Sequence, residues 1–331
     1  ESLPAGISLR DTGMLRLRDL PHPMHVFQLM HPGLSPSLCE LGDTSGGNKL
    51  TTEPMARFRP VDLYEVPTLP TIVVHALKVL QNPNSDARAV ERVIVNDPAI
   101  SAKILRVANS AFFGYSRRVS TIAEAVRVLG FTNVQGMIIS VGAFDAFRTE
   151  RLNLLDFWKH SIATATAARF LSPQLRCSAD EAFMAGILHD IGKLIFAVQA
   201  EPGYHQVLAL RRGTAALSSL EAERTLFEFT HPEVGEMVAE RWDLPARYVA
   251  AIAHHHDPDA AGEERTFCAL IGLADQAAYA ALDAGQPATE GDAERRALLD
   301  TLALLPQRWD ECLQHVREAR PNIAALLGAI G

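Results

Sequence analysis

The sequence predicts an all-α fold with a small β element at its N-terminus. From about Val61 onward, helix-capping patterns recur at short intervals, and no segment alternates apolar and polar residues convincingly. Before that point, residues 7–10 and 15–18 do alternate, on either side of Asp11-Thr12-Gly13. This arrangement predicts a hairpin that turns at residues 11–13, with a further strand at residues 26–30.

Several helix starts can be placed from local sequence. Asp97 supplies an N-cap acceptor directly before Pro98, and proline is favoured in the first turn of a helix. Further helices are predicted to open at three capping boxes, Thr121-x-x-Glu124, Ser178-x-x-Glu181 and Thr230-x-x-Glu233. After Ser178 the apolar residues continue at helical spacing as far as Ile195, which places His189 and Asp190 in the middle of that helix.

Composition narrows the class of protein. The chain has 31 basic and 39 acidic residues, a net charge of −8, and we expect no nucleic-acid partner because a phosphate backbone attracts a basic surface. The four cysteines are far apart and form no C-x-x-C pair, which fits a reducing cytoplasm rather than a disulfide framework. Apolar stretches such as residues 134–147, which Gln135 and Asp145 interrupt, are too short for a membrane helix.

The chain is predicted to have four parts. Residues 1–34 hold the β element, and residues 35–60 are rich in Ser, Gly, Pro and Thr without periodicity, as in a linker. Residues 61–260 form the main helical region, followed by a helical extension over residues 261–331. In this extension an apolar face, which either covers the core or forms a homodimer, contains Leu298, Leu299, Leu302, Leu305, Ile323, Leu326 and Leu327.

Imidazoles and carboxylates suggest a metal site. Seven of the twelve histidines lie between His160 and His256. Taken singly, each is explained as well by a hydrogen-bonded core histidine. Mixed imidazole and carboxylate ligands suit iron, manganese or zinc, and a carboxylate such as Asp190 can bridge two ions. The joint pattern therefore predicts a site for two divalent ions, with the ligand candidates Asp156, His160, His189, Asp190, His231, His255, His256 and Asp275.

Residues 69–258 resemble the HDOD domain, a relative of the HD phosphohydrolases. The matching stretches follow in order and include VPTLPTIVVHALKVL, NDPAISAKILRVANSAFFG, TIAEAVRVLGFTNVQGMIISVGAFDAF, FWKHSIATA, FMAGILHDIGKLIF, HPEVGEMVAERWDLP and AIAHHHDP. The resemblance implies an HD-like helical bundle in two helical subdomains, residues 61–150 and residues 151–260. It also implies a bacterial signalling module that has lost catalysis.

The chain is also similar to the HD-GYP phosphodiesterases. The eight ligand candidates match that family's metal ligands, except that Asp156 takes a position where glutamate is common, and Lys193 matches the lysine of the HD-x-G-K motif. Asp257-Pro258-Asp259-Ala260-Ala261 replaces the Gly-Tyr-Pro segment, a departure that argues against cyclic di-GMP hydrolysis. Separately, residues 3–34 resemble the C-terminal end of a class III nucleotide-cyclase domain, without its metal-binding or base-recognising residues.

Two functions from different classes follow. The leading hypothesis is a cytoplasmic regulatory HDOD module that binds signalling proteins, or a nucleotide or phosphoester ligand, without turnover. The alternative is a metal-dependent phosphohydrolase, in which Asp190 bridges two ions and Lys193 neutralises a phosphate oxygen. Metal content and hydrolysis of phosphodiesters distinguish the two hypotheses.

Overall fold

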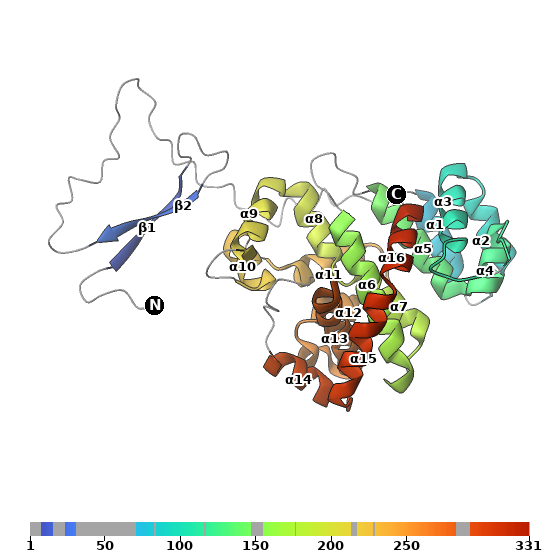
Figure 1. Ribbon diagram of the computed structural model, residues 1–331. Coiled ribbons are helices and arrows are strands. Elements are labelled where there is room, and N and C mark those ends of the chain that lie inside the picture. Colours follow the sequence, from blue (N-terminus) through green and yellow to red (C-terminus); the bar gives the residue numbers. More distant parts are fainter. Residues whose placement is uncertain are drawn as a thin grey trace, which may run out of the picture. The chain divides into compact units, whose positions relative to one another are not determined.

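The structure is a computed structural model (Figure 1). In it the chain consists of two compact units, Glu1–Phe58 and Arg59–Gly331. Each unit is described by itself. The residues described are 8–15, 24–30, 71–82, 84–115, 117–146, 155–175, 177–212, 217–227, 229–282 and 292–330. The predicted linker at residues 35–60 lies outside the described residues.

The first unit contains two antiparallel strands, β1 (Ser8–Leu15) and β2 (Met24–Met30). The prediction of a hairpin turn at residues 11–13 is wrong, because these residues lie within β1. The pairing of β1 with β2 is irregular between Asp11 and Met14. A bulge accommodates one or more unpaired residues in a continuing strand, so a glycine-containing segment need not reverse the chain.

Over the residues that the structure describes, the second unit contains helices joined by turns and loops, and no strand. Its N-terminal part consists of α1 (Thr71–Gln81), α2 (Ala87–Ile94), α3 (Pro98–Ala108), α4 (Ile122–Leu129) and α5 (Phe131–Ala146). The predicted caps are confirmed: the Asp97 side chain accepts from the N–H groups at the start of α3, and the Thr121 hydroxyl accepts from the N–H of Glu124. Gly130 has a φ of 84°, so α4 ends there and α5 begins in a new direction.

The remaining helices form the larger part of the unit. They are α6 (Leu155–Leu171), the 3₁₀ helix η3 (Ser172–Leu175), α7 (Ala179–Leu188), α8 (Ile191–Gln199), α9 (Glu201–Arg212), α10 (Ser219–Phe227), α11 (His231–Arg241), α12 (Ala246–His254), the 3₁₀ helix η4 (Pro258–Glu264), α13 (Arg265–Leu282), α14 (Asp292–Thr301), α15 (Pro306–Glu318) and α16 (Arg320–Ile330).

Helix α6 is the centre of the packing. All of its residues from Ser161 to Ala168 are buried, and it contacts α7, α13, α15 and α16 (Figure 1). Small residues permit this close packing: a Cβ on Gly186 of α7 would collide with the backbone of Ala165. A helix enclosed on all sides can direct polar side chains inward only if they find partners there.

The C-terminal helices cover the core. Helix α16 contacts α3, α5 and α6, and so connects the two helical parts of this unit. Of the apolar residues predicted to form one face, all except Leu305 are buried, which confirms the core-covering explanation. Leu305 is 72% exposed. Among the helices described, none is both long and apolar enough to cross a membrane.

Candidate metal centre

The His189-Asp190 pair lies at a junction between helices, not in the middle of one as predicted. Helix α7 ends at Leu188 with His189 as its C-cap, and Asp190 is the N-cap of α8. The chain therefore changes direction at these two residues. The apolar spacing in the sequence does not reveal the end of α7, because Ile191 and Leu194 of α8 are also buried in the core. At a junction, both side chains can be directed into one interior space.

Four residues from three places in the chain form what we call the His–Asp cluster: His160, His189, Asp190 and Asp275. His160 Nε2 lies 2.7 Å from Asp275 Oδ1. His189 Nε2 lies 3.3 Å from Asp275 Oδ1 and 3.3 Å from Asp190 Oδ2. Helices α6 and α13 supply His160 and Asp275, and these two central helices pack directly against each other.

Three histidines form a second group, the triple-His cluster: His231, His255 and His256. His231 Nε2 lies 3.4 Å from His255 Nε2 and 3.2 Å from His256 Nε2. Helix α11 begins at His231, and His255 and His256 directly follow the end of α12. The imidazoles therefore meet because α11 packs against α12.

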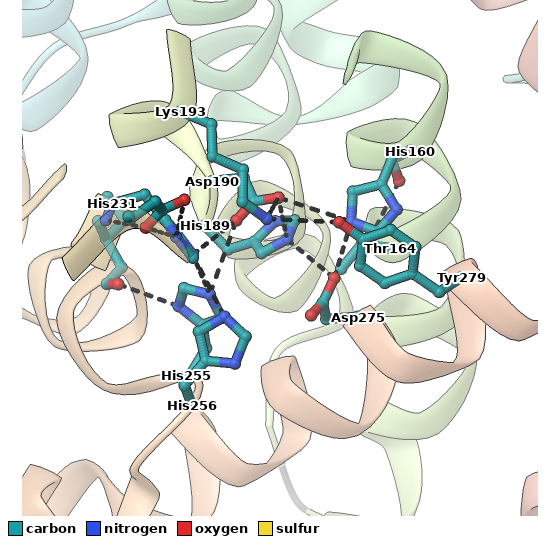
Figure 2. A network of polar contacts seen from close by, with 12 residues as sticks. His160, Thr164, His189, Asp190, Lys193, His231, His255, His256, Asp275 and Tyr279 are labelled. Carbon is teal, nitrogen blue, oxygen red and sulfur yellow. Dashed lines mark hydrogen bonds and ion pairs between the residues drawn. The ribbon is translucent and has the colours of Figure 1, made fainter. Parts of the chain in front are cut away.

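The Asp190 carboxylate lies between the two clusters, as Figure 2 shows. Its Oδ1 is 3.2 Å from His231 Nε2 and 3.7 Å from His255 Nε2. Its Oδ2 is 3.3 Å from His189 Nε2 and 3.7 Å from His160 Nε2. One carboxylate thus presents one oxygen to each cluster, which is the arrangement that a bridging ligand requires.

Hydrogen bonds at the far side of three imidazoles fix which nitrogen faces inward. His189 Nδ1 lies 2.8 Å from the carbonyl oxygen of Gly186, and His255 Nδ1 lies 3.0 Å from that of Ile252. A carbonyl oxygen only accepts, so each Nδ1 must carry its proton and donate. His231 Nδ1 is similarly 2.8 Å from a carboxylate oxygen of Glu223. These contacts leave Nε2 as the ligand nitrogen in each ring.

The centre is buried and has unsatisfied polar atoms. His189 and His231 are fully buried, and Asp190 is 1% exposed. Within the part of the chain that the structure describes, Asp190 Oδ1 and His160 Nδ1 have no hydrogen-bond partner, although Asp190 Oδ1 lies 3.2 Å from His231 Nε2. A buried, unpartnered carboxylate oxygen beside inward-facing imidazole nitrogens is costly without a cation. The residues present therefore fit a divalent metal ion, and their mixed nitrogen and oxygen donors suit iron, manganese or zinc.

The pKa shifts also indicate that the buried carboxylates of the centre favour a nearby positive charge. Burial lowers the pKa of His189, but the nearby Asp190 and Asp275 carboxylates outweigh it and raise this pKa to about 10. Burial raises the pKa of Asp190, yet His189 and Lys193 hold it well below the usual value. Burial, together with the charges of His231 and Lys193, lowers the pKa of His256 to about 3. The ionised Asp190 and the unprotonated His256 are forms that bind metal, whereas a metal ion would have to displace the proton that His189 holds.

Lys193 is engaged with Asp190. Its Nζ lies 2.6 Å from Asp190 Oδ2 and 3.4 Å from Tyr279 Oη. The Tyr279 ring in turn packs against the His160 ring, with 4.1 Å between their centroids. The role predicted for Lys193, neutralising a phosphate oxygen, stays a prediction, and the ammonium already has an anionic partner in the protein.

The structure brings all predicted ligands together except Asp156. This residue is in the first turn of α6, one turn before His160, and its side chain is exposed. A spacing of four residues places Asp156 and His160 on one face of the helix, but it does not indicate whether each side chain is buried or exposed. That the other residues bind metal remains a prediction.

Sequence reasoning missed Glu223 and Tyr279. Glu223 is 1% exposed, and it contacts His231 from a different helix. A signal was present: Ser219, Glu223 and Phe227 are four residues apart on α10, and all three are buried. A glutamate at a position with the spacing of a buried face needs a partner. The sequence offered no means of naming that partner.

A cleft borders the triple-His cluster. It has a volume of about 840 Å³, and its walls come mainly from α10, α11 and α12. His256 lines it, together with His254, which belongs to neither cluster. Four carboxylates also line it, those of Glu221, Glu233, Glu236 and Asp257, with one arginine, Arg224. The cleft beside the triple-His cluster is therefore acidic.

The helical bundle and its buried His and Asp residues define an HD-type protein. The chain belongs to the HDOD domain family, which matches residues 66–258.

Two relatives of known sequence match part of this chain. A protein from Treponema pallidum is 27% identical over 214 residues, which is 60% of this chain and 39% of that protein. Ribonuclease Y from Thermus thermophilus is 33% identical over 146 residues, or 44% of this chain and 20% of the enzyme. The similarity thus spans less than half the length of these relatives.

Solved structures support the fold. A crystal structure from Shewanella amazonensis, described as a "putative phosphohydrolase", has a TM-score of 0.67 at 24% identity and covers 82% of this chain and 97% of that chain. A "putative signal transduction protein" from Marinobacter aquaeolei has a TM-score of 0.67 at 25% identity. The match covers 80% of this chain and 59% of that chain. An HDOD domain protein from Geobacter sulfurreducens has a TM-score of 0.62 at 23% identity, covering 82% and 96%.

Proposed function

We propose that this chain is a signal-transduction module that holds divalent metal in its two clusters and acts by binding, without turnover. The observation that carries the proposal is the position of Asp190, with one oxygen toward each cluster in a buried centre. Membership of the HDOD family supports a regulatory role, as does the similarity to the Marinobacter aquaeolei protein. Of the two kinds of partner expected, a signalling protein or a nucleotide or phosphoester ligand, we propose the signalling protein, because the cleft beside His256 is acidic.

The contacts and charges near the centre favour binding over hydrolysis. The cleft beside His256 has four carboxylates and one arginine among its lining residues, and that arginine, Arg224, is 3.0 Å from Glu233. An acidic cleft repels a phosphoester anion rather than concentrating it. In addition, the Lys193 ammonium is paired with Asp190. A group already bound to a carboxylate stabilises a phosphate less effectively.

Metal analysis and an activity assay test this proposal together. The chain, expressed with iron and manganese supplements and then dialysed, is expected to retain at least about one ion per molecule, because a buried multidentate centre binds tightly. His189→Ala should lower that content, and neither protein should hydrolyse bis(4-nitrophenyl) phosphate. Clearly substoichiometric metal in the unmodified chain would contradict the metal proposal. Hydrolysis that disappears in His189→Ala would favour the second candidate.

A second candidate is a metal-dependent phosphodiesterase. A specific observation favours it: the region shared with ribonuclease Y is 33% identical, and seven predicted ligands lie in the two clusters. When bound, divalent ions would supply an acidified water and a polarised phosphoryl oxygen. In this chain the imidazoles and Asp190 would hold the ions, and the Glu223 carboxylate would orient His231.

Its test is a direct comparison of substrates. If the chain is an enzyme, an oligoribonucleotide or a cyclic dinucleotide should be cleaved in the presence of Mn²⁺, with loss of cleavage in His189→Ala. If a preparation shown to contain metal cleaves neither of these substrates nor bis(4-nitrophenyl) phosphate, this candidate is excluded for those substrates and a metal-containing binding module is left.

A further inference from the structure

The His–Asp cluster already has a lysine cation at its edge. Lys193 Nζ lies 2.6 Å from Asp190 Oδ2, the oxygen that faces this cluster. Only 5% of Lys193 is exposed, so its charge is balanced by protein groups rather than by bulk water. Asp190 Oδ1, which faces the triple-His cluster, lies 3.2 Å from His231 Nε2 and has no hydrogen-bond partner among the described residues. The two oxygens of one carboxylate are thus unequal.

Other contacts increase this difference. In the His–Asp cluster, His160 Nε2 and Asp275 Oδ1 are 2.7 Å apart, so an ion must replace an existing hydrogen bond. In the triple-His cluster, three Nε2 atoms approach one another at 3.2 and 3.4 Å. Because His231 and His255 carry their protons on Nδ1, their Nε2 lone pairs face each other at 3.4 Å, and a cation between them would stabilise this contact.

We propose that the two clusters bind metal unequally and that Lys193 sets the difference. The triple-His cluster, with Asp190 Oδ1, takes the first divalent ion. The His–Asp cluster takes a second ion more weakly, because that ion shares Asp190 Oδ2 with the Lys193 ammonium. Two cations at one buried oxygen repel each other strongly, since little water is present to screen them. This inference rests on the proposed metal centre and adds the order in which it fills.

Titration of the metal-free full chain with Mn²⁺ tests the inference. Electron paramagnetic resonance measures free Mn²⁺ at each point and distinguishes an isolated bound ion from a coupled pair. The unmodified chain is expected to show two binding steps whose dissociation constants differ by at least about tenfold. His255→Ala should remove the tighter step, and Asp275→Asn should remove the weaker one.

Lys193→Met is the decisive variant, because methionine keeps an unbranched apolar side chain without the charge. The two dissociation constants are expected to come within about threefold of each other, through a tighter second step. Lys159→Met, at an exposed position of α6, is the matched control and should leave both steps unchanged. If Lys193→Met does not fold, as judged by circular dichroism, Lys193→Gln serves the same purpose.

The contrary outcomes are distinct. Two steps of equal affinity in the unmodified chain would overturn the unequal filling while leaving the metal centre intact. A tenfold gap that persists in folded Lys193→Met or Lys193→Gln would overturn the role of Lys193. Absence of any Mn²⁺ binding would overturn the proposed metal centre, and this inference with it.

Discussion

The Glu223 carboxylate contacts His231 at Nδ1, whereas His231 Nε2 faces the other imidazoles of its cluster. Both carboxylate oxygens are within 3.0 Å of Nδ1, and Oε2 also accepts from the backbone N–H of His231 at 2.7 Å. Despite burial, which lowers it, the pKa of His231 is raised by the Glu223 charge. A residue outside the ligand set thus fixes both the orientation and the basicity of a ligand.

Glu223→Gln should weaken metal binding at the triple-His cluster by roughly 10- to 100-fold, because the outer carboxylate orients the ring and raises its basicity. The measurement is Mn²⁺ affinity by titration. Glu221→Gln provides the control: this glutamate is two residues away on the same helix, is exposed, and accepts from the backbone N–H of Ser218 at 2.9 Å. Equal affinities for the unmodified chain and Glu223→Gln would contradict the assignment.

Among the helices, the close approach of α8 and α11 determines whether the clusters meet. A Cβ on Gly192 would collide with the carbonyl oxygen of His231 and would lie 2.8 Å from the backbone nitrogen of Gly235. Because Gly192 follows Asp190 by two residues, this contact sets the separation between Asp190 and His231. The glycine of the HD-x-G-K pattern is therefore needed for packing, whatever the function of the centre.

Gly192→Ala should destabilise the protein by at least about 1–3 kcal/mol, because backbone atoms must move to admit the methyl group. It should also weaken metal binding, since α8 and α11 move apart. Urea unfolding and Mn²⁺ titration measure the two effects. Gly328→Ala is the matched control: it lies in α16 with no atom of the described residues within 4 Å of the added Cβ, and it should be neutral or stabilising by roughly 0.5–1 kcal/mol. Equal stability of both variants would refute the packing argument.

At the scale of the helical unit, α16 connects the N-terminal helices to α6. Ile323 is 1% exposed and Leu326 is 3% exposed, and Arg106 Nε of α3 donates to the carbonyl oxygen of Ala329 at 3.4 Å. Helix α15 adds a further contact, because the Arg308 guanidinium lies 4.0 Å from the centre of the Phe170 ring of α6. The C-terminal extension is therefore part of the same core as the HDOD region.

Leu326→Ala should lower the free energy of unfolding by about 2–5 kcal/mol, because it leaves a cavity between α16 and the helices beneath it. Leu305→Ala removes an equal volume from an exposed side chain and should change stability by no more than about 0.5 kcal/mol. Urea denaturation followed by circular dichroism compares them. If the two losses were similar, α16 would not be a structural part of this unit.

Much of this fold could be predicted from the sequence where the signal is local. The caps at Asp97, Thr121 and Ser178 each involve residues within one turn, so residue type alone indicated where α3, α4 and α7 begin. The break at His189-Asp190 could not be predicted in this way. The apolar residues on both sides are compatible with one continuous helix, and the interruption depends on how α8 packs against α11.

For the candidate site too, local patterns could be predicted from the sequence, whereas contacts between helices could not. Histidines at positions such as His231 and His255 were identifiable because imidazoles are rare and were concentrated in one region. Glu223 was not, because its contact with His231 depends on the angle between α10 and α11 rather than on spacing. Asp156 was misplaced for a related reason: sequence spacing specifies the face of a helix, whereas exposure depends on which neighbours cover its first turn.

Burial of the centre has a kinetic consequence. Of the clustered residues, His256 lines the cleft, while His189, His231 and Asp190 are enclosed by helices. Ions that enter or leave from the cleft must pass the His256 ring, and other routes require the bundle to open locally. Chelators should therefore extract the ions slowly, at a rate that becomes independent of chelator concentration once opening of the protein is limiting.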